Sequence, residues 1–245
     1  MRRILSRTRA AVDDYKMIKS GDKIAVGVSG GKDSVMLLKV LCELKRFYPE
    51  KFDVVAITLD MRFDNKDGDF SKISQMCEEY GIEYVIKSTE LYEIIFNIRK
   101  ESSPCSLCAR MRRGILHDTA KELGCNKIAL GHHLDDAAET FMMNLLIESR
   151  VGCFSPVTYL SRKDITMIRP LVYIREREIE QAVTRLDLPI VKSLCPANEN
   201  TKREDAKNLL KTLSTEYGDV PEKIVGAMQR GEVSNWEKLP QISDT

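Results

Sequence analysis

The sequence predicts an α/β fold in which a parallel five-stranded sheet is covered by helices on both faces. Five short apolar runs recur along the chain, and segments with apolar residues at helical spacing lie between them. Strands that alternate with helices are typical of parallel sheets, which are buried on both faces. With 245 residues, the chain is long enough to bury a substantial core without disulfides or structural metals.

Composition and charge narrow the class of protein. Hydrophobic residues make up 43% of the chain and charged residues 31%, which is the ordinary range for a soluble protein. Lysine and arginine total 38 against 37 acidic residues, so any affinity for nucleic acid must come from local patches. No apolar run approaches the roughly 20 residues that span a bilayer, and the basic start lacks the apolar stretch of a signal peptide. We therefore expect a cytoplasmic protein that does not enter a membrane.

The expected elements fall into three parts. Residues 1–20 repeat apolar positions at helical spacing and carry several arginines, so a basic amphipathic helix is expected there. An α/β domain is expected over residues 21–175, and a small helical extension over residues 176–245. The five expected strands are short and apolar, and they lie at residues 23–28, 52–59, 82–86, 126–130 and 165–168. Helices are expected between them, and two of these begin near Pro104 and Asp135.

The first strand ends in a glycine-rich turn that opens a helix. The turn consists of Ser29, Gly30, Gly31, Lys32, Asp33 and Ser34. Backbone N–H groups at a helix start carry partial positive charge, and a lysine and two hydroxyls lie beside them here, so the turn suits phosphate oxygens. The spacing matches neither the Walker A motif nor the dinucleotide motif G-x-G-x-x-G. A capping turn without a ligand is the structural alternative.

The same residues fit a second motif. Residues 27–31 read G-x-S-x-G, the nucleophile elbow of α/β-hydrolases, which makes Ser29 a formal nucleophile. Such an enzyme needs a base, usually a histidine late in the chain, but the last of the three histidines is His133. A hydrolase is therefore the weakest of the functional alternatives.

The sequence Ser-Gly-Gly-Lys-Asp-Ser after a first strand resembles the pyrophosphate loop of N-type ATP pyrophosphatases, the PP-loop superfamily. The resemblance implies ATP binding, activation of a carbonyl oxygen as its AMP ester, and a five-stranded sheet of the adenine nucleotide alpha-hydrolase (HUP) type. Asp60, at the end of the second strand, would lie where such folds contact the nucleotide. A solvated acid at a strand end is the alternative for this residue.

A second polar turn follows the fourth strand, from Gly131 and His132 to Asp135 and Asp136. Because it leaves the same edge of the sheet, it is expected to face the glycine turn. Paired carboxylates beside phosphates most simply hold Mg²⁺, and an acidic helix start favoured by the helix dipole is the alternative. The stretch resembles the Gly-His-His-x-Asp-Asp signature shared by lysidine synthetases and tRNA thiolases. Arg169 matches a recurrent segment of that superfamily and is expected to meet phosphate, with a surface ion pair as the alternative.

Seven cysteines, an odd number, fit reduced thiols or metal ligands better than a disulfide framework. Cys105 and Cys108 form a C-x2-C pair at a helix start, a spacing that redox dithiols, zinc sites and iron–sulfur sites share. Cys195, in a later loop, is the best third ligand. Three thiolates leave one position open, which suits a [4Fe-4S] cluster better than structural zinc. Cys153 is ambiguous, and the cysteines expected in the core are Cys42, Cys77 and Cys125.

Residues 104–116, which contain this pair, resemble a segment of the tRNA 2-thiocytidine synthetase family, and the resemblance runs from about Arg2 to Cys195. It implies that the pair and a distant third cysteine bind a [4Fe-4S] cluster, and that cytidine 32 of tRNA becomes 2-thiocytidine. The sulfur would come from a cysteine desulfurase or from sulfide. The chain departs from the family pattern at Asn198, where a second cysteine often stands, and this puts the target nucleotide in doubt.

Arginines are expected to bind the RNA backbone. Residues 1–23 contain seven basic and three acidic residues, a local charge of +4 in a chain whose total is +1. A solvated helix face is the alternative for any one of them. The candidates lie in the first helix and directly after the cysteine pair, and they are Arg2, Arg3, Arg7, Arg9, Arg110, Arg112 and Arg113.

Together these patterns predict an ATP-dependent tRNA thiolase. Lys32 would hold the β- and γ-phosphates, and Asp33 or the carboxylates of the acidic turn would hold Mg²⁺. A flipped-out pyrimidine would attack the α-phosphate through its C2 oxygen, and sulfur would then displace AMP. Two alternatives stay open: a lysidine-synthetase-like ligase, which has no use for Cys105 and Cys108, and a zinc-stabilised RNA-binding module. The sequence also leaves open whether two chains form a homodimer.

Overall fold

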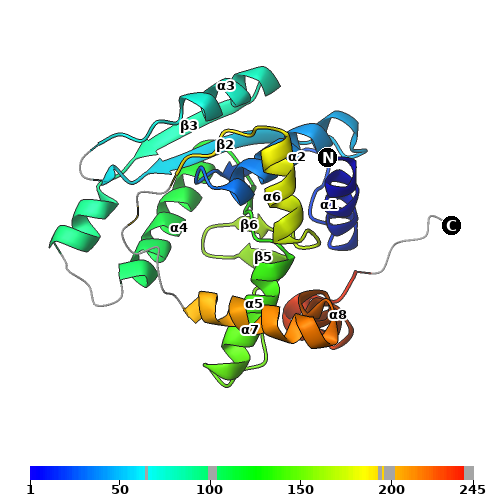
Figure 1. Cartoon of the computed structure of the whole chain (residues 1–245). Coiled ribbons are helices and arrows are strands. Elements are labelled where there is room, and N and C mark those ends of the chain that lie inside the picture. The colour runs from blue at the N-terminus through cyan, green and yellow to red at the C-terminus, as the bar shows by residue number, and fades with distance from the viewer. Residues whose placement is uncertain (64–65, 99–103, 193–194, 196–201, 240–245) are drawn as a thin grey trace.

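The computed structural model describes residues 1–63, 66–98, 104–192, 195 and 202–239. It contains one six-stranded sheet with the order β3-β2-β1-β4-β6-β5, surrounded by helices (Figure 1). The strands are β1 (Lys23–Gly27), β2 (Asp53–Asp60), β3 (Glu83–Ser88), β4 (Lys127–Ala129), β5 (Val157–Leu160) and β6 (Ile165–Ile168). The helices of the first half are α1 (Arg2–Asp14), α2 (Lys32–Phe47), α3 (Ser71–Tyr80), the π-helical η2 (Glu93–Ile98) and α4 (Pro104–Glu122). Those of the second half are α5 (Leu134–Leu146), α6 (Glu176–Arg185), α7 (Lys202–Tyr217), α8 (Val220–Arg230) and the 3-10 helix η3 (Val233–Asn235).

The order of the strands reverses between β1 and β4. The chain runs outward from β1 through β2 to β3, and then returns to place β4 on the other side of β1. Ile24 of β1 lies opposite Val54 of β2 and Lys127 of β4, and both pairings are parallel. In open α/β sheets, ligands bind beyond the carboxyl ends of the strands at such a reversal. The topology therefore predicts a ligand site at the turns after β1 and β4.

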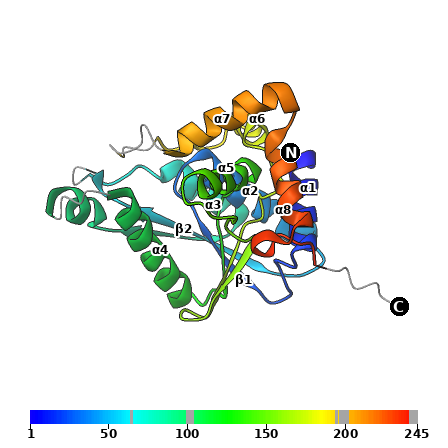
Figure 2. The same cartoon turned by 90° about the horizontal axis from the view of Figure 1, so that it is seen from below.

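The two faces of the sheet bury unequal cores. Ile24 and Val26 point into a large core that includes α1, α2, α5, α6 and α8, whereas Ala25 points into a smaller core with α4. This alternation follows from the two-residue period of a strand. Figure 2 shows α4 on one side of the sheet and α2 and α5 on the other. The predicted α/β fold with helices on both faces is confirmed.

The predicted number of strands is wrong by one. Residues 157–160 form β5, which pairs antiparallel with β6 at the edge of the sheet, so the sheet is not entirely parallel. The side chains of β5 are half-buried or exposed, and Tyr159 is 61% exposed. An edge strand of this kind has no continuous apolar run, and the apolar pattern of the sequence could not reveal it.

The C-terminal helices pack on the same core as the rest of the chain. α7 and α8 both lie against α5. Trp236, which is fully buried, donates from Nε1 to the Phe154 carbonyl oxygen at 2.7 Å, and its own carbonyl accepts from the Tyr15 hydroxyl at 3.0 Å. The segment expected as an extension thus contacts both the expected N-terminal helix and the α/β domain. No helix within the described residues is both long enough and apolar enough to cross a bilayer.

Candidate active site

The glycine loop, residues 29–34, is held in shape by a glycine in the left-handed region. Gly30 has a φ of +86°, which residues with a Cβ rarely adopt. A Cβ at this position would also lie 2.8 Å from the Cβ of Val191, whose N–H donates to the Gly30 carbonyl oxygen at 2.9 Å. Within the loop, Ser34 Oγ accepts from the Ser29 N–H at 3.1 Å. Val191 and the glycine loop therefore form one fixed unit.

A cavity of about 600 Å³ lies at the carboxyl ends of β1 and β4. Its polar wall comes from both polar turns, from the end of β6 and from α4, and includes Ser29, Gly31, Asp33, Ser34, Gly131, His132, Asp136, Arg169, Arg112 and Arg113. The two turns touch, because a Cβ on Gly131 would lie 3.0 Å from the carbonyl carbon of Asp33. The expectation that they share one edge is met. A larger cavity lies elsewhere, between α1 and α6.

Three side chains in this wall hold buried polar atoms that lack a hydrogen-bond partner among the described residues. They are Asp33 through Oδ1, His132 through Nδ1 and Arg169 through Nε. Arg169 is only 6% exposed, and its other end is fixed by Nη1, which donates to the Ser155 carbonyl oxygen. An unpaired buried polar group costs about 1–3 kcal/mol, and native proteins pair nearly all of them. All three residues line the cavity, so a polar ligand that enters it would lie beside them.

Burial sets the protonation of this trio. It lowers the pKa of His132 to about 4, with the charge of Arg169 acting in the same direction, so the imidazole is neutral at pH 7. Burial raises the pKa of Asp33 above its ordinary value, although His133 and Lys32 act against it. Burial also lowers the pKa of Arg169 to about 10, which leaves the guanidinium charged. The cavity thus offers a cation, a neutral imidazole and a poorly solvated carboxylate to its ligand.

The carboxylates of the acidic turn are already paired. Asp135 accepts from Nε and Nη2 of Arg175, at 2.9 and 2.7 Å, and from the Glu176 N–H at 2.6 Å. Asp136 closes the capping box of α5 by accepting from the His133 N–H at 3.0 Å, and it pairs with Arg203 at 2.9 Å. Asp136 lines the cavity, whereas Asp135 is not among the described residues that do. The structure therefore gives Asp135 an anchoring role at the start of α6.

Lys32 points away from the cavity towards α6. Its Nζ lies 2.8 Å from Glu176 Oε1 and 3.5 Å from Asp33 Oδ2. Burial acts to lower the pKa of Lys32, but the hydrogen bond to Glu176 and the surrounding carboxylates outweigh it and raise the pKa. Lys207 of α7 also contacts Glu176, at 2.7 Å. A phosphate that binds Lys32 would have to share its ammonium group with the carboxylate of Glu176 or displace that carboxylate.

Asp60 organises the loop after β2. Its carboxylate is buried and accepts from the N–H groups of Arg62 at 3.0 Å and Gly68 at 2.9 Å. It is not among the described residues that line the cavity. In this structure Asp60 holds its own loop by backbone hydrogen bonds, and the nucleotide contact expected for it stays a prediction.

The cysteine pair lies in the first turns of α4, where Cys105 is exposed and Cys108 is half-buried. Burial raises the pKa of Cys108; the charge of Arg112 acts against this, while Cys195 and Cys105 raise it further. The three thiols are therefore close enough to interact electrostatically. In the described part of the chain, no three His, Cys, Asp or Glu side chains form a ready-made metal cage. The three-cysteine ligand set therefore stays a prediction.

The other cysteines behave as expected for small core residues. Cys42, Cys77 and Cys125 are buried, and burial raises the pKa of Cys42 and of Cys77 to about 12. Cys153, which the sequence left ambiguous, is half-buried, and its thiol lies 3.4 Å from the Ala137 carbonyl oxygen. None of these four shares the surroundings of the α4 pair.

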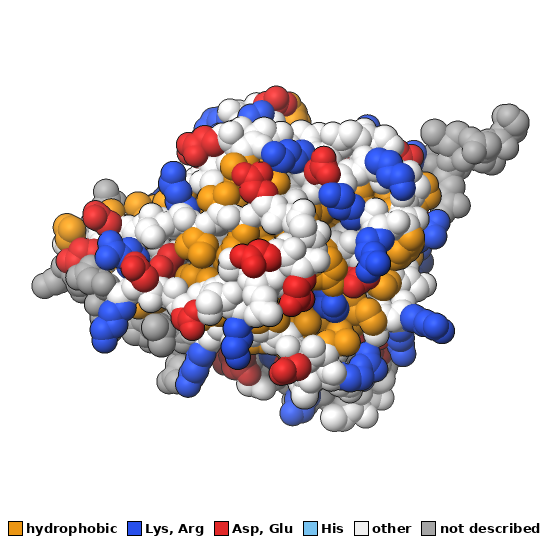
Figure 3. Space-filling model, turned by 90° about the horizontal axis from the view of Figure 1, so that it is seen from above, with side chains coloured by type: hydrophobic (Ala, Val, Ile, Leu, Met, Phe, Trp, Pro, Cys, Tyr) orange, Lys and Arg blue, Asp and Glu red, His pale blue; other side chains and the backbone are white. Residues whose placement is uncertain are grey.

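The arginines expected to bind RNA lie on two helices, α4 and α1. Arg112 and Arg113 line the cavity, and Arg110 is exposed beside them on α4. Arg7 is engaged within the fold, because it contacts Glu178, Glu222 and the Tyr173 carbonyl oxygen. The remaining three are exposed on α1; of these, Arg9 pairs with Asp13 and Arg3 with Glu178, and the third is Arg2. Figure 3 shows basic and acidic side chains interspersed over one face, without a concentrated basic patch on that face.

Sequence reasoning missed Phe154 and Arg203. Phe154 lines the cavity, with its ring 5.0 Å from the centroid of His132 and 5.0 Å from the guanidinium of Arg169, and Trp236 packs behind it. Arg203 reaches from α7 to Asp136. Phe154 follows no periodic pattern, so the sequence carried no signal for it. The single tryptophan of the chain was the nearest hint that its C-terminal part is buried.

Comparisons with known proteins agree with this site. A family model described as a PP-loop domain matches residues 3–210. A tRNA-cytidine(32) 2-sulfurtransferase of Geobacter metallireducens is 39% identical over 230 residues, which are 93% of this chain and 89% of that protein. A protein of the same name from Pelobacter propionicus is 40% identical over 93% of this chain and 85% of its own length. The solved U34-tRNA thiolase NcsA from Methanococcus maripaludis, with its [4Fe-4S] cluster, is similar with a TM-score of 0.74 and 27% identity, covering 98% of this chain and 80% of that one.

Fold and site thus define an α/β protein with a phosphate-type loop at the reversal point of its sheet. The chain belongs to the PP-loop family and, within it, to the tRNA-cytidine(32) 2-sulfurtransferases, which are enzymes of tRNA thiolation. The family expected from the sequence is confirmed, and so is the expected enzyme class. A non-enzymatic RNA-binding module does not fit this membership.

Proposed function

We propose that this chain uses ATP to replace the C2 oxygen of cytidine 32 in tRNA with sulfur, and that Cys105, Cys108 and Cys195 hold a [4Fe-4S] cluster for this reaction. The relatives are named for the cytidine activity, and the similar thiolase is described with such a cluster. The observation that carries the proposal is the position of α4. Ala109, directly after Cys108, lines the same cavity as the glycine loop.

The third cysteine supports the same arrangement. Val191, four residues before Cys195, is hydrogen-bonded to Gly30 of the glycine loop. The electrostatic effect of Cys195 and Cys105 on the pKa of Cys108 supports a shared role for the three thiols. Three soft thiolates suit an iron–sulfur cluster, and a cluster with three protein ligands keeps one iron available for the sulfur that is transferred.

The cavity wall suits the first half of the reaction. The glycine loop would receive the phosphates of ATP, and Arg169 and His132 would donate to oxygens around the α-phosphorus. Asp33, with its unpaired Oδ1, would hold Mg²⁺ together with Asp136. The C2 oxygen of the pyrimidine attacks the α-phosphorus, and the bond to pyrophosphate breaks. This makes the C2 oxygen part of a good leaving group.

In the second half of the reaction, a C–S bond replaces the C–O bond at C2 of the pyrimidine. Sulfur at the oxidation level of sulfide attacks C2, the C–O bond to AMP breaks, and neither oxidant nor reductant is consumed. The sulfur reaches the site as sulfide. Sulfur that a cysteine desulfurase supplies as a persulfide must first be reduced to sulfide by two electrons from a thiol reductant, which leaves as a disulfide. Arg112 and Arg113, in the cavity wall beside the cysteine pair, would neutralise phosphates of the RNA as its base enters. The protein's part is to align three reactants and to exclude water.

Anaerobic metal analysis tests the cluster. The protein is expected to hold about four iron and four sulfide per chain and to show the broad visible absorbance of a cluster. Alanine at Cys105, Cys108 or Cys195 should abolish iron binding and thiolation, whereas Cys153→Ala, a matched control of similar burial, should preserve both. Stoichiometric zinc without iron would contradict the cluster part of the proposal.

Nucleoside analysis tests the target. Transfer RNA from a deletion strain should lack 2-thiocytidine, and the purified enzyme with ATP and sulfide should restore it. If the enzyme restores a different thiolated nucleoside, the proposed target nucleotide is wrong, but the proposed thiolation reaction stands. If the cysteine variants remain active with an amine as the nucleophile, the ligase alternative is correct.

A further inference from the structure

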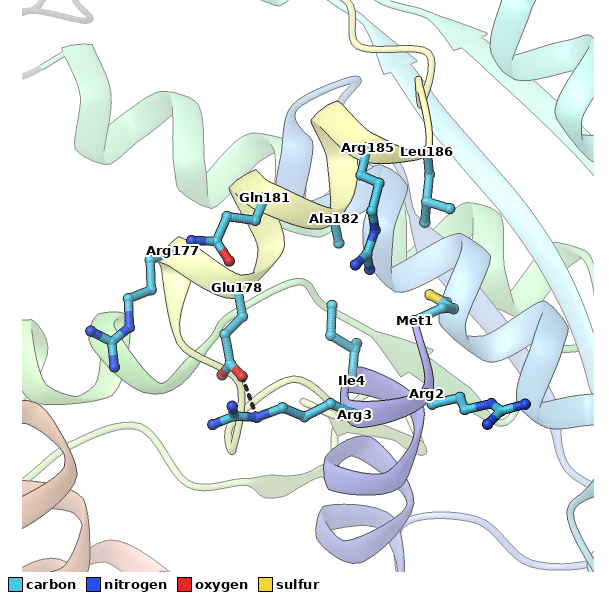
Figure 4. A pocket seen from close by; sticks show the side chains of 10 residues that line it. All are labelled: Met1, Arg2, Arg3, Ile4, Arg177, Glu178, Gln181, Ala182, Arg185 and Leu186. Atoms are coloured by element: carbon cyan, nitrogen blue, oxygen red, sulfur yellow. Dashed lines mark ion pairs between the residues drawn. The ribbon is translucent and has the colours of Figure 1, made fainter.

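A second cavity, of about 800 Å³, lies away from the nucleotide cavity, in a groove between the first turn of α1 and one side of α6. Figure 4 shows its lining side chains. Its floor is apolar, with Ile4, Ala182 and Leu186. Four arginines line it, two from each helix: Arg2, Arg3, Arg177 and Arg185.

The groove has a surplus of positive charge. The single acidic side chain among its described lining residues, Glu178, is already paired with Arg3 at 2.8 Å and with Arg7 at 3.2 Å. Arg177 is 3.6 Å from Asp219 at an exposed position, where such a pair contributes little. Arg2 and Arg185 have no ion pair with any described acidic residue. Like charges held together without counter-charges are unfavourable, and an anion would relieve the repulsion.

The arrangement of the arginines indicates the shape of the anion. Arg177, Gln181 and Arg185 are four residues apart and form a stripe along α6. In Figure 4, Arg185 points towards the start of α1, whereas Arg2 and Arg177 extend away from each other at opposite sides of the groove. A small anion needs donors that converge on one point. Donors spread along a groove match a chain of phosphates.

The groove is close enough to the nucleotide cavity for one RNA to reach both. Glu176, the first residue of α6, contacts Lys32 of the glycine loop at 2.8 Å, and Arg185 is the last residue of the same helix. A ten-residue helix is about 15 Å long. This is less than half of a roughly 34 Å turn of a nucleic-acid duplex.

We propose that the groove between α1 and α6 binds the phosphodiester backbone of the tRNA, through Arg2, Arg177 and Arg185, while the target base lies in the nucleotide cavity. The inference rests on the proposed tRNA substrate and adds a second contact to it. It revises the expectation for α1, because Arg7 and Arg9 pair within the protein and are not part of this contact.

Binding of unmodified tRNA, without ATP or sulfur, tests this proposal. The double variant Arg2→Gln/Arg185→Gln should raise the Kd about tenfold at physiological salt, and the slope of log K against log salt should fall by about 0.7–0.9 for each phosphate that is no longer neutralised. Lysine at both positions should restore most of the affinity, because an ammonium also neutralises a phosphate. Both arginines lack an ion pair with any described residue, so thermal unfolding and the KM for ATP should not change.

Arg9→Gln is the matched control, because Arg9 is exposed on the same helix but lies outside the groove. An unchanged Kd and slope in the double variant would overturn the groove proposal, as would an equal loss in Arg9→Gln. Release of tRNA from the groove by tripolyphosphate at equal phosphate concentration would assign it to a small anion instead. Thiolation by the parent enzyme would stand in each of these cases, so the two proposals fail separately.

Discussion

Two carboxylates from neighbouring polar turns, Asp33 and Asp135, differ in their hydrogen bonding and in their position relative to the cavity. Asp33 lies in the cavity wall, and its Oδ1 is buried without a hydrogen-bond partner among the described residues, with His133 Nε2 3.9 Å away. Asp135 lies outside the cavity and accepts from both the side chain of Arg175 and the N–H of Glu176. Both belong to motifs that predict phosphate or metal chemistry. Only Asp33 retains an unmet polar atom with which to bind a ligand.

The difference teaches how to separate a binding residue from an anchoring residue inside one motif. Native structures pair their buried polar groups, so an unpaired group beside a cavity points to a ligand. A fully paired carboxylate holds the protein together. Asp135 fixes the start of α6, and α6 in turn presents Glu176 to Lys32. Three substitutions test whether Asp33 binds a ligand and Asp135 anchors the fold.

The largest effect is expected from Asp33→Asn. Loss of the carboxylate should lower kcat/KM for thiolation roughly 100-fold, because charge stabilisation at the α-phosphorus is lost. Thermal stability should change little, since the side chain of Asp33 is 32% exposed and its ion pair with Lys32 is long, at 3.5 Å. The control is Asp53→Asn. Asp53 is exposed and lies at the amino end of β2, whereas the cavity lies at the carboxyl edge of the sheet. If Asp33→Asn is destabilised but fully active, Asp33 stabilises the fold, as Asp135 does, and does not bind a ligand.

Asp135→Asn should show the reverse pattern. Arg175 loses the charge of a partner that is only 14% exposed, and the free energy of unfolding should fall by about 2 kcal/mol. Urea denaturation measures this loss. Well below the unfolding temperature, kcat/KM should fall less than in Asp33→Asn. Full stability together with lost activity would show that Asp135 acts on the substrate after all.

The smallest effect is expected from Glu139→Gln, read as a pH dependence. Burial raises the pKa of Glu139 from 4.5 to about 7 with help from Asp136, although Arg203, 3.2 Å away, acts against it. Between these values the folded state holds a proton that the unfolded state releases, so stability should decline as the pH rises through this window. The variant cannot ionise there, and its melting temperature should vary less between about pH 5 and pH 8. Equal slopes for parent and variant would contradict the raised pKa.

Local patterns were sufficient for most of the fold. Apolar runs located five strands to within a few residues, because buried strands of a parallel sheet must be apolar on both faces. The glycine loop was readable because Gly30 needs a positive φ. β5 was not predicted because an edge strand exposes its side chains. The backbone hydrogen bonds that Asp60 accepts from Arg62 and Gly68 could not be predicted either, because N–H groups carry no side-chain signal.

The sequence was sufficient for the α/β class, the phosphate-type loop after β1 and the acidic turn after β4, because each depends on residues that are close together along the chain. Only the tertiary structure decided which carboxylate pairs with an arginine and which faces the cavity. It also decided that Phe154 and Arg203 reach the site, and that Arg2 shares a groove with Arg185. Such pairings join residues that lie far apart along the chain, and packing brings them together in ways that no local spacing encodes.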